Sequence, residues 1–251
     1  MTESRSEKRP HSREIHWRGP VKTLAQAARF IDHAGFCVLF PVKNVPLPSL
    51  YFAASKRAEL RWDKYAQLVW KWKDELPKKR RAFYGKYFKG RGTFLSLEFL
   101  PQFLATQGTA IEPREAEPFY KAGRVSRDAA DLWLELAKHG PLATLELRHA
   151  ARMESKAGNK RFKKAIVELE GLLIVTHSGA EQETEAWASV CFDLVTRSFP
   201  EQVEEARAIA AEQARVAIAL QYKTLYPGAV PADVARLFRW TKAQAARALS
   251  L

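Results

Sequence analysis

The sequence predicts a mainly α-helical protein with short β-hairpins, an α+β fold made of tandem winged helix-turn-helix units. The first observation is a segment, residues 128–194, that has the pattern of three helices followed by two β-rich runs. The second is a C-terminal part, residues 201–249, that repeats the helix-turn-helix pattern with a different sequence. The third is the content of apolar residues, 47% of 251, which is enough to bury more than one compact unit.

The segment 128–194 carries clear helix boundaries. Ser126 is placed to cap a first helix over 128–139, which Gly140 and Pro141 end. Thr144 is the expected N-cap of a second helix over 145–153, and a polar turn follows it. These signals predict two short helices in tandem, joined by a tight turn.

A third helix is expected to open at Asn159 and to end at Gly171. Its apolar residues recur at i, i+3, i+4 and i+7, which is the spacing of one buried stripe: Phe162, Ala165, Ile166 and Leu169. Two β-rich runs, 172–176 and 187–194, follow it and flank a loop over 178–185. Three helices and a hairpin are the layout of a protein that places its third helix in the major groove of DNA.

Basic residues dominate the second and third of these helices. Between residues 148 and 164 there are seven Lys or Arg and one acid, Glu154; the basic residues are Arg148, Arg152, Lys156, Lys160, Arg161, Lys163 and Lys164. We interpret them as DNA-binding residues, and the alternative is a solvated face of an ordinary helical subdomain. Three carboxylates near the tip of the hairpin, Glu181, Glu183 and Glu185, would repel phosphate, so the third helix is expected to do most of the binding.

A second basic region spans residues 56–92 and accounts for most of the formal net charge of +13. It holds 13 Lys or Arg against four acids, together with eight aromatic residues, more than half of which we expect to be buried. Basic residues interleaved with rings can bind a phosphate backbone and stack on bases. The expected contacts are Lys78, Lys79, Arg80, Arg81, Lys86, Lys89 and Arg91. The run 78–81 follows Pro77, which is expected at or near a helix start, where the helix dipole does not favour cations.

One acidic pair, Asp74 and Glu75, lies inside this basic and aromatic stretch. A carboxylate there could serve as a general base toward an extruded nucleotide. The alternative is that it forms an ion pair with Lys71 or Lys78 across one helical turn.

The chain divides into a polar tail and three units by its changes of composition. The expected boundaries are a disordered polar tail over 1–21, a first winged-helix-like unit with the basic insertion and a linker over 22–120, a second winged helix over 121–199, and a third helix-turn-helix unit without a visible wing over 200–251. In the first unit, Thr23 and Gln26 form a capping box for a helix over 24–33, and a strand over 36–40 follows Gly35. A helix around 50–65 is expected to continue toward Trp72, and one long helix is expected over 201–225.

Several classes of protein are disfavoured by what the sequence lacks. There is no apolar run near 18 residues, and the polar N-terminus has no secretory signal, so neither membrane nor export is expected. The two cysteines, Cys37 and Cys191, lie in separate apolar runs and indicate a reduced, cytoplasmic protein. The six histidines have no spacing typical of a metal site, and no cofactor fingerprint is present, so neither metal nor cofactor is expected.

The chain as a whole resembles the winged-helix family that includes the bacterial DNA glycosylases AlkZ and YcaQ. The resemblance covers roughly residues 22–251 and is carried by the stretch from Ala34-Gly35-Phe36 to Tyr51 and by the two later helix-turn-helix units. It implies tandem winged helices that form a concave platform for double-stranded DNA, and, in the glycosylases, excision of alkylated or cross-linked bases.

The chain departs from that family at the residues that carry the chemistry. The glycosylases have Gln, one residue, then Asp or Gln just ahead of a proline, and setting Pro41 on that proline places Val38 and Phe40 at the two polar positions. Neither hydrocarbon side chain can orient water or stabilise a developing positive charge on the sugar. The C-terminal β-barrel of the family is also not visible.

The function that the sequence predicts is therefore duplex DNA binding without the glycosylase chemistry. The first alternative is a DNA glycosylase or base-repair enzyme that uses Asp74 or Glu75. The second is a protein-interaction scaffold whose basic surface meets an acidic partner, since winged helices also serve that role.

Overall fold

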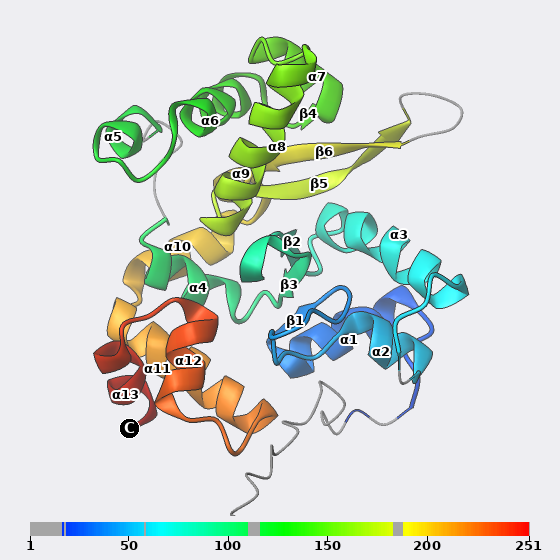
Figure 1. Cartoon of the computed structure of the whole chain (residues 1–251), viewed down its shortest axis with the longest axis vertical. Helices are drawn as coiled ribbons and strands as arrows, with labels where there is room; N and C mark the ends of the chain where they lie inside the picture. Colours follow the sequence, from blue (N-terminus) through cyan, green and yellow to red (C-terminus); the bar gives the residue numbers. More distant parts are fainter. Residues whose placement is uncertain (1–16, 18, 58, 110–115, 183–187, 251) are drawn as a thin grey trace, which may run out of the picture.

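The structure is a computed structural model, and it describes residues 17, 19–57, 59–109, 116–182 and 188–250. In this part of the chain there are 13 α-helices and two antiparallel sheets of three strands each. The predicted class, mainly helical α+β, is confirmed. In Figure 1 the first three helices and the last four occupy two sides of one half of the molecule, and α6–α8 with the β5–β6 hairpin form the other half.

The first helix follows the boundaries that the sequence predicts. Helix α1, Leu24–Ala34, has the Thr23–Gln26 capping box at its start and Gly35, with φ of 74°, at its end. The positive φ of Gly35 turns the chain directly into strand β1, Phe36–Val38. Ahead of the helix, the indole of Trp17 packs edge-on against Phe30 with ring centroids 5.7 Å apart.

The helix predicted from Leu50 toward Trp72 is two helices, so that prediction is wrong. Helix α2, Leu50–Ser55, ends at Lys56 in a left-handed conformation. Helix α3, Lys64–Lys78, starts afresh because the Asp63 side chain accepts hydrogen bonds from the backbone N–H groups of Tyr65 and Ala66.

Pro77 lies in the last turn of α3, and the prediction that it stands at a helix start is also wrong. Proline has no N–H, so at position 77 it cannot donate the helical hydrogen bond to the carbonyl of Lys73, and the helix ends one residue later. The basic run 78–81 therefore follows the C-terminal end of the helix, where the dipole favours cations rather than opposing them.

Strands β1, β2 (Phe83–Gly85) and β3 (Thr93–Leu95) form an antiparallel sheet in the order β1-β3-β2. All nine of its residues are buried, because helices cover both faces. Successive side chains point to opposite faces: Cys37, Tyr84 and Phe94 join a core with α1–α3, and Phe36, Phe83 and Leu95 join a second core. Gly90 ends the short 3₁₀ turn Phe88–Gly90 between β2 and β3.

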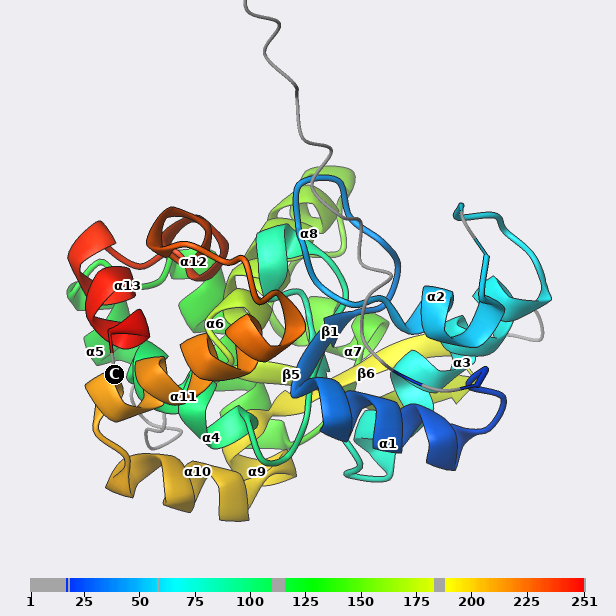
Figure 2. The same cartoon turned by 90° about the horizontal axis from the view of Figure 1, so that it is seen from below.

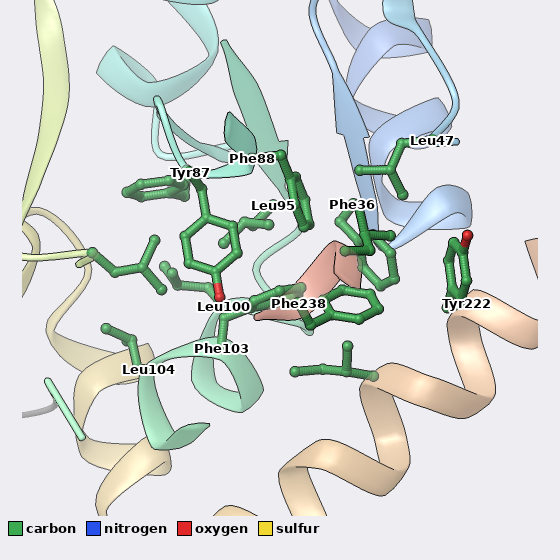
Figure 3. Packing of buried hydrophobic residues seen from close by; sticks show 14 of the residues in the cluster. Phe36, Leu47, Tyr87, Phe88, Leu95, Leu100, Phe103, Leu104, Tyr222 and Phe238 are labelled. Atoms are coloured by element: carbon green, nitrogen blue, oxygen red, sulfur yellow. The ribbon is translucent and has the colours of Figure 1, made fainter. Parts of the chain in front are cut away.

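The second core joins parts of the chain that are far apart in the sequence. Its residues come from the first sheet, from α4 (Leu100–Gln107) and from the last helices. Figure 3 shows Phe36, Phe103 and Phe238 converging there, and the rings of Phe36 and Phe238 meet edge to face with centroids 5.7 Å apart. The side-chain amide of Gln221 also donates to the carbonyl of Ala34, at 2.9 Å. The N-terminal and C-terminal regions are therefore packed as one body.

Residues 127–194 form a third core and a more regular unit. The elements in order are α6 (Arg127–His139), β4 (Leu142–Ala143), α7 (Thr144–Ala150), α8 (Lys156–Gly171), β5 (Val175–Gln182) and β6 (Ala188–Leu194). The sheet order is β4-β6-β5. Helix α8 begins three residues before the predicted start, because Ser155 caps it through the N–H of Gly158. Strand β4 was not predicted, and β5 extends to Gln182, into the predicted loop over 178–185.

The long helix predicted over 201–225 is broken, which corrects that prediction. Helix α10, Pro200–Ala208, and helix α11, Ala211–Leu225, are separated by Ile209, whose backbone is extended. The break allows both helices to pack against α4. The short helices α5 (Ala116–Lys121) and α9 (Val195–Ser198) precede them, and α12 (Pro231–Phe238) and α13 (Lys242–Leu249) follow. Figure 2 shows α10, α12 and α13 on one side of the molecule, with α11 reaching from there toward β1.

Two further expectations concern the cysteines and the membrane. Cys37 and Cys191 are both buried, and burial raises the pKa of the Cys37 thiol. Within the ranges that the structure describes, no helix has both the length and the apolar character needed to cross a bilayer.

Candidate nucleic-acid interface and a buried charge cluster

Helix α8 presents one basic face and one apolar face. Phe162, Ile166 and Leu169 are buried against α6 and the hairpin. On the opposite side, four exposed lysines lie at i, i+4, i+7 and i+8: Lys156, Lys160, Lys163 and Lys164. In the described part of the chain no carboxylate forms an ion pair with any of the four. We call these four residues the α8 lysine face.

The three arginines predicted beside this face are placed differently. Arg161 forms an ion pair with Asp128 at the start of α6. Arg148 donates to the carbonyl oxygens of Met153 and Glu154, at 3.2 and 2.7 Å, and so closes the turn between α7 and α8. Arg152 is exposed in that turn, with φ of 56°. Two of the three guanidinium groups therefore hold the fold together.

The seven predicted basic contacts in the first unit also divide into two groups. Lys86 lies 3.5 Å from a carboxylate oxygen of Glu170, and Lys89 donates to the carbonyl of Asn44 at 2.9 Å. The remaining five are exposed: Lys78, Lys79, Arg80, Arg81 and Arg91. The stem of Lys78 lies against the backbone of Gly179 in β5, which brings the end of α3 next to the hairpin.

Asp74, the first candidate general base, is held in a network of ion pairs. Its two carboxylate oxygens each lie 2.7 Å from the ammonium of Lys73, and Nδ1 of His177 lies 3.3 Å from one of them. The partners proposed from sequence, Lys71 and Lys78, are not the ones it uses. Glu75, the second candidate, is exposed on the other side of the helix.

The network continues into the second unit. Nε2 of His177, on β5, lies 3.2 Å from a carboxylate oxygen of Glu170, which is fully buried at the end of α8. The ring of Tyr84, on β2, meets the imidazole edge to face with centroids 4.7 Å apart. We call Asp74, His177 and Glu170, with Lys73 and Lys86 at the two ends, the interunit charge cluster. It connects α3 and β2 to α8 and β5, which belong to the unit over residues 127–194.

The inner end of this cluster is made of close polar contacts rather than directed hydrogen bonds among the described residues. Among the described residues, Nε2 of His177 and both oxygens of Glu170 have no hydrogen bond of good geometry despite their short distances to charged groups. Burial alone would raise the pKa of Asp74, but the hydrogen bond from His177 and the charge of Lys73 outweigh it and hold that pKa below its usual range. Burial, with the Glu170 and Asp74 charges, raises the pKa of Tyr84.

The positions matched to the polar motif of the glycosylases carry no reactive group. Val38 is fully buried in the second core. Phe40 is half-buried and stacks on Trp70, with ring centroids 6.2 Å apart, beside the exposed Trp62. Of the eight aromatic residues in 62–88, five are buried, which confirms that most of them belong to the core: Trp72, Phe83, Tyr84, Tyr87 and Phe88.

Sequence reasoning missed Lys73, Glu170 and His177. For Glu170 a signal existed, because it lies four residues after Ile166 and eight after Phe162, on the buried stripe of α8. A carboxylate at such a position requires a buried partner. His177 lies 103 residues from Asp74, and no local pattern links the two. Glu181 is at the described end of β5, and Glu183 and Glu185 are outside the described residues.

This geometry defines the class as a mainly helical α+β protein with two small sheets and an exposed lysine face on α8. The model of the AlkZ-related family matches residues 21–239, and the chain belongs to that family. No curated protein and no solved structure matches it.

Proposed function

We propose that this protein binds duplex DNA through the α8 lysine face and lacks the base-excision chemistry of the glycosylases in its family. The observation that carries the proposal is the face itself: four exposed lysines in one row, without ion-pair partners in the described ranges. Family membership supports it, because the AlkZ-related family has a relation to DNA repair proteins.

The position of α8 in its unit supports the same function. The order helix, strand, helix, helix, strand, strand over residues 127–194, with sheet order β4-β6-β5, supports our interpretation of this unit as a winged helix-turn-helix. In that arrangement the third helix is the recognition helix, which lies in the major groove. The Ser155 cap and the buried stripe fix α8 in place, so its lysines project from a rigid element.

Unpaired lysines suit a polyanion better than paired ones do. A lysine that neutralises a phosphate releases a condensed counterion, whereas one that already has a carboxylate partner must first lose that partner. A second exposed basic group, residues 78–81 at the end of α3, lies next to β5 of the unit that contains α8.

The test is fluorescence anisotropy of a labelled duplex titrated with the whole chain at several salt concentrations. If about six phosphates are contacted, log K falls with log salt at a slope near −5, and each contacting lysine replaced by Ala reduces the slope by about 0.9. A variant with Lys156, Lys160, Lys163 and Lys164 changed to Ala is therefore expected to bind weakly and with a shallow slope.

The matched control changes four exposed lysines elsewhere and removes the same net charge: Lys121, Lys138, Lys223 and Lys242. It is expected to bind nearly as the parent does. Equal losses of duplex affinity in the two variants would show that binding depends only on net charge, and would refute a specific binding face. No duplex binding by the parent at low salt would favour the protein scaffold instead.

A further inference from the structure

A second candidate site lies at the C-terminal end of α8. A cavity of about 220 Å³ forms where the end of α8 meets α4, α11 and the turn between α12 and α13. None of the residues of the α8 lysine face or of the interunit charge cluster lines it. The groups that matter for its chemistry are Tyr87, Gln107, Arg215, Arg239, Trp240 and Gln244.

The two arginines of this cavity have unused donors. Nε of Arg215 is buried without a hydrogen-bond partner among the described residues, which is a costly state for a charged group. Arg239 ends α12 in a left-handed conformation, with φ of 59°, and in the described ranges it has no ion pair. Two guanidinium groups therefore line one small space, and neither has an ion-pair partner among the residues that the structure describes.

The neutral polar groups of the cavity also offer donors. The phenol of Tyr87 accepts a hydrogen bond from the amide of Gln107 at 2.7 Å, and burial raises its pKa to about 12, so it keeps its proton. The side-chain carbonyl of Gln244 already accepts from the backbone of Thr241, and its NH₂ group donates to no group in the described part of the chain. No carboxylate from the described part of the chain lines the cavity.

A site rich in donors and without acidic groups selects an anion. A metal ion or an organic cation would meet two positive charges and no compensating ligand. A wholly apolar ligand would leave the guanidinium groups unpaired, whereas a carboxylate or phosphate pairs with arginine through two parallel hydrogen bonds.

Two stacked aromatic rings also line the cavity. Trp240 stacks on Phe238 with ring centroids 5.0 Å apart and an interplanar angle of 27°, and both side chains line the space. Such a surface accepts a planar ring. The volume of 220 Å³ is below the ~300 Å³ at which pockets for drug-sized ligands begin, so the ligand must be small.

We infer that this cavity binds a small aromatic oxyanion, with its carboxylate or phosphate between Arg215 and Arg239 and its ring against Trp240. The inference is independent of the proposed DNA-binding function, since the two sites share no residue. An aromatic carboxylate and an aromatic phosphate share the chemistry that the cavity would recognise, namely a planar ring that bears an oxyanion.

Isothermal titration of the whole chain tests this with benzoate, phenyl phosphate, benzamide and inorganic phosphate. Benzoate or phenyl phosphate is expected to bind at least about tenfold more tightly than neutral benzamide, because a charge-assisted pair adds about 1.4 kcal/mol or more. Equal affinity for benzamide would refute an anion site, and inorganic phosphate as tight as phenyl phosphate would refute the role of the ring. Binding of none of the four probes would overturn the inference as a whole.

Variants separate the proposed site from adventitious binding. Arg239→Asn is expected to lose about tenfold or more in affinity, and Asn tolerates the left-handed backbone that position 239 requires. Arg236→Gln, on the same helix and exposed, is the matched control and should bind as the parent does. Arg215→Lys keeps the charge but removes the bidentate geometry, and it should weaken binding as well. Unchanged affinity in both Arg239→Asn and Arg215→Lys would overturn the proposal.

Discussion

Two stretches of this chain have similar charge in the sequence and differ in how the fold uses it. Residues 78–91 hold seven Lys or Arg without an acid, and residues 156–164 hold five. In the first stretch Lys86 and Lys89 are engaged by Glu170 and by a backbone carbonyl. In the second, four of the five have no ion pair in the described ranges. The first stretch therefore has two of its seven basic side chains engaged within the fold and five exposed, whereas on α8 the four lysines of one face are exposed together on a single helix.

Helix α8 contains that contrast within its own length. Its first two turns carry the lysine face, and its last turn buries the carboxylate of Glu170 in the interunit charge cluster. One end of the helix is therefore free to meet a partner while the other end connects the two units. The predictions below test this division, from the largest expected effect to the smallest.

The largest effect is expected from the apolar side of α8. Phe162→Ala should lower the free energy of unfolding by about 3–5 kcal/mol, because it deletes a ring that is 3% exposed. Lys160→Ala and Lys163→Ala, on the other side of the same helix, should each cost under ~0.5 kcal/mol. Chemical denaturation measures all three. A lysine variant as unstable as Phe162→Ala would mean that the lysine side packs in the fold.

The interunit charge cluster should give a smaller effect that depends on pH. Asp74→Asn is expected to cost about 1.5–3 kcal/mol near neutral pH, since it removes a charged acceptor from Lys73 and His177. The pKa of Asp74 is lowered in the folded state, so its stabilisation is fully present above the unfolded pKa of about 3.9 and is lost as the pH falls through the folded value.

The difference in stability between parent and Asp74→Asn should accordingly be constant above about pH 5 and shrink below pH ~4. Urea unfolding at a series of pH values measures it. Glu75→Gln is the matched control, because Glu75 is exposed on the same turn and should change stability by under ~0.5 kcal/mol at every pH. A difference that grew on acidification would contradict the sign of the Asp74 pKa shift.

The sequence could predict the parts of this structure that depend on neighbouring residues. The capping box at Thr23, the end of α1 at Gly35 and the stripe of α8 are all local patterns, and the structure contains them. The outward position of the α8 lysines follows directly from that stripe. The basic run at the end of α3 was predicted as well, although Pro77 was expected at a helix start and lies instead in the last turn of α3.

The parts that could not be predicted depend on contacts between distant residues. The break at Ile209 results from packing of α10 and α11 on α4, about a hundred residues earlier in the chain. The pairing of Asp74 with His177 depends on β5 crossing α3. A carboxylate in a basic stretch has many sequence neighbours of opposite charge, and only the fold decides which of them it meets.

The comparison between engaged and available lysines predicts a difference in DNA binding. Lys160→Ala with Lys163→Ala should weaken duplex binding several-fold at moderate salt, because each lost phosphate contact removes about one released counterion. Lys86→Ala with Lys89→Ala removes the same charge from side chains that already have partners, and it should weaken binding less. Anisotropy titrations at one salt concentration compare the pairs. A larger loss in the second pair would place the interface on the first unit instead.

The last prediction is that the protein does not excise bases. Val38 and Phe40 offer no group that could polarise water or stabilise charge at the anomeric carbon, and Val38 is fully buried. Of the two carboxylates that could substitute, Asp74 has both oxygens beside the Lys73 ammonium and Glu75 points to solvent. Parent and an Asp74→Asn, Glu75→Gln double variant are therefore expected to release no base from methylated or cross-linked duplexes in single-turnover assays. Release by the parent that the double variant loses would make this chain an enzyme with a relocated site. Release that persists in the double variant would show that the alignment of Pro41 with the glycosylase proline is wrong.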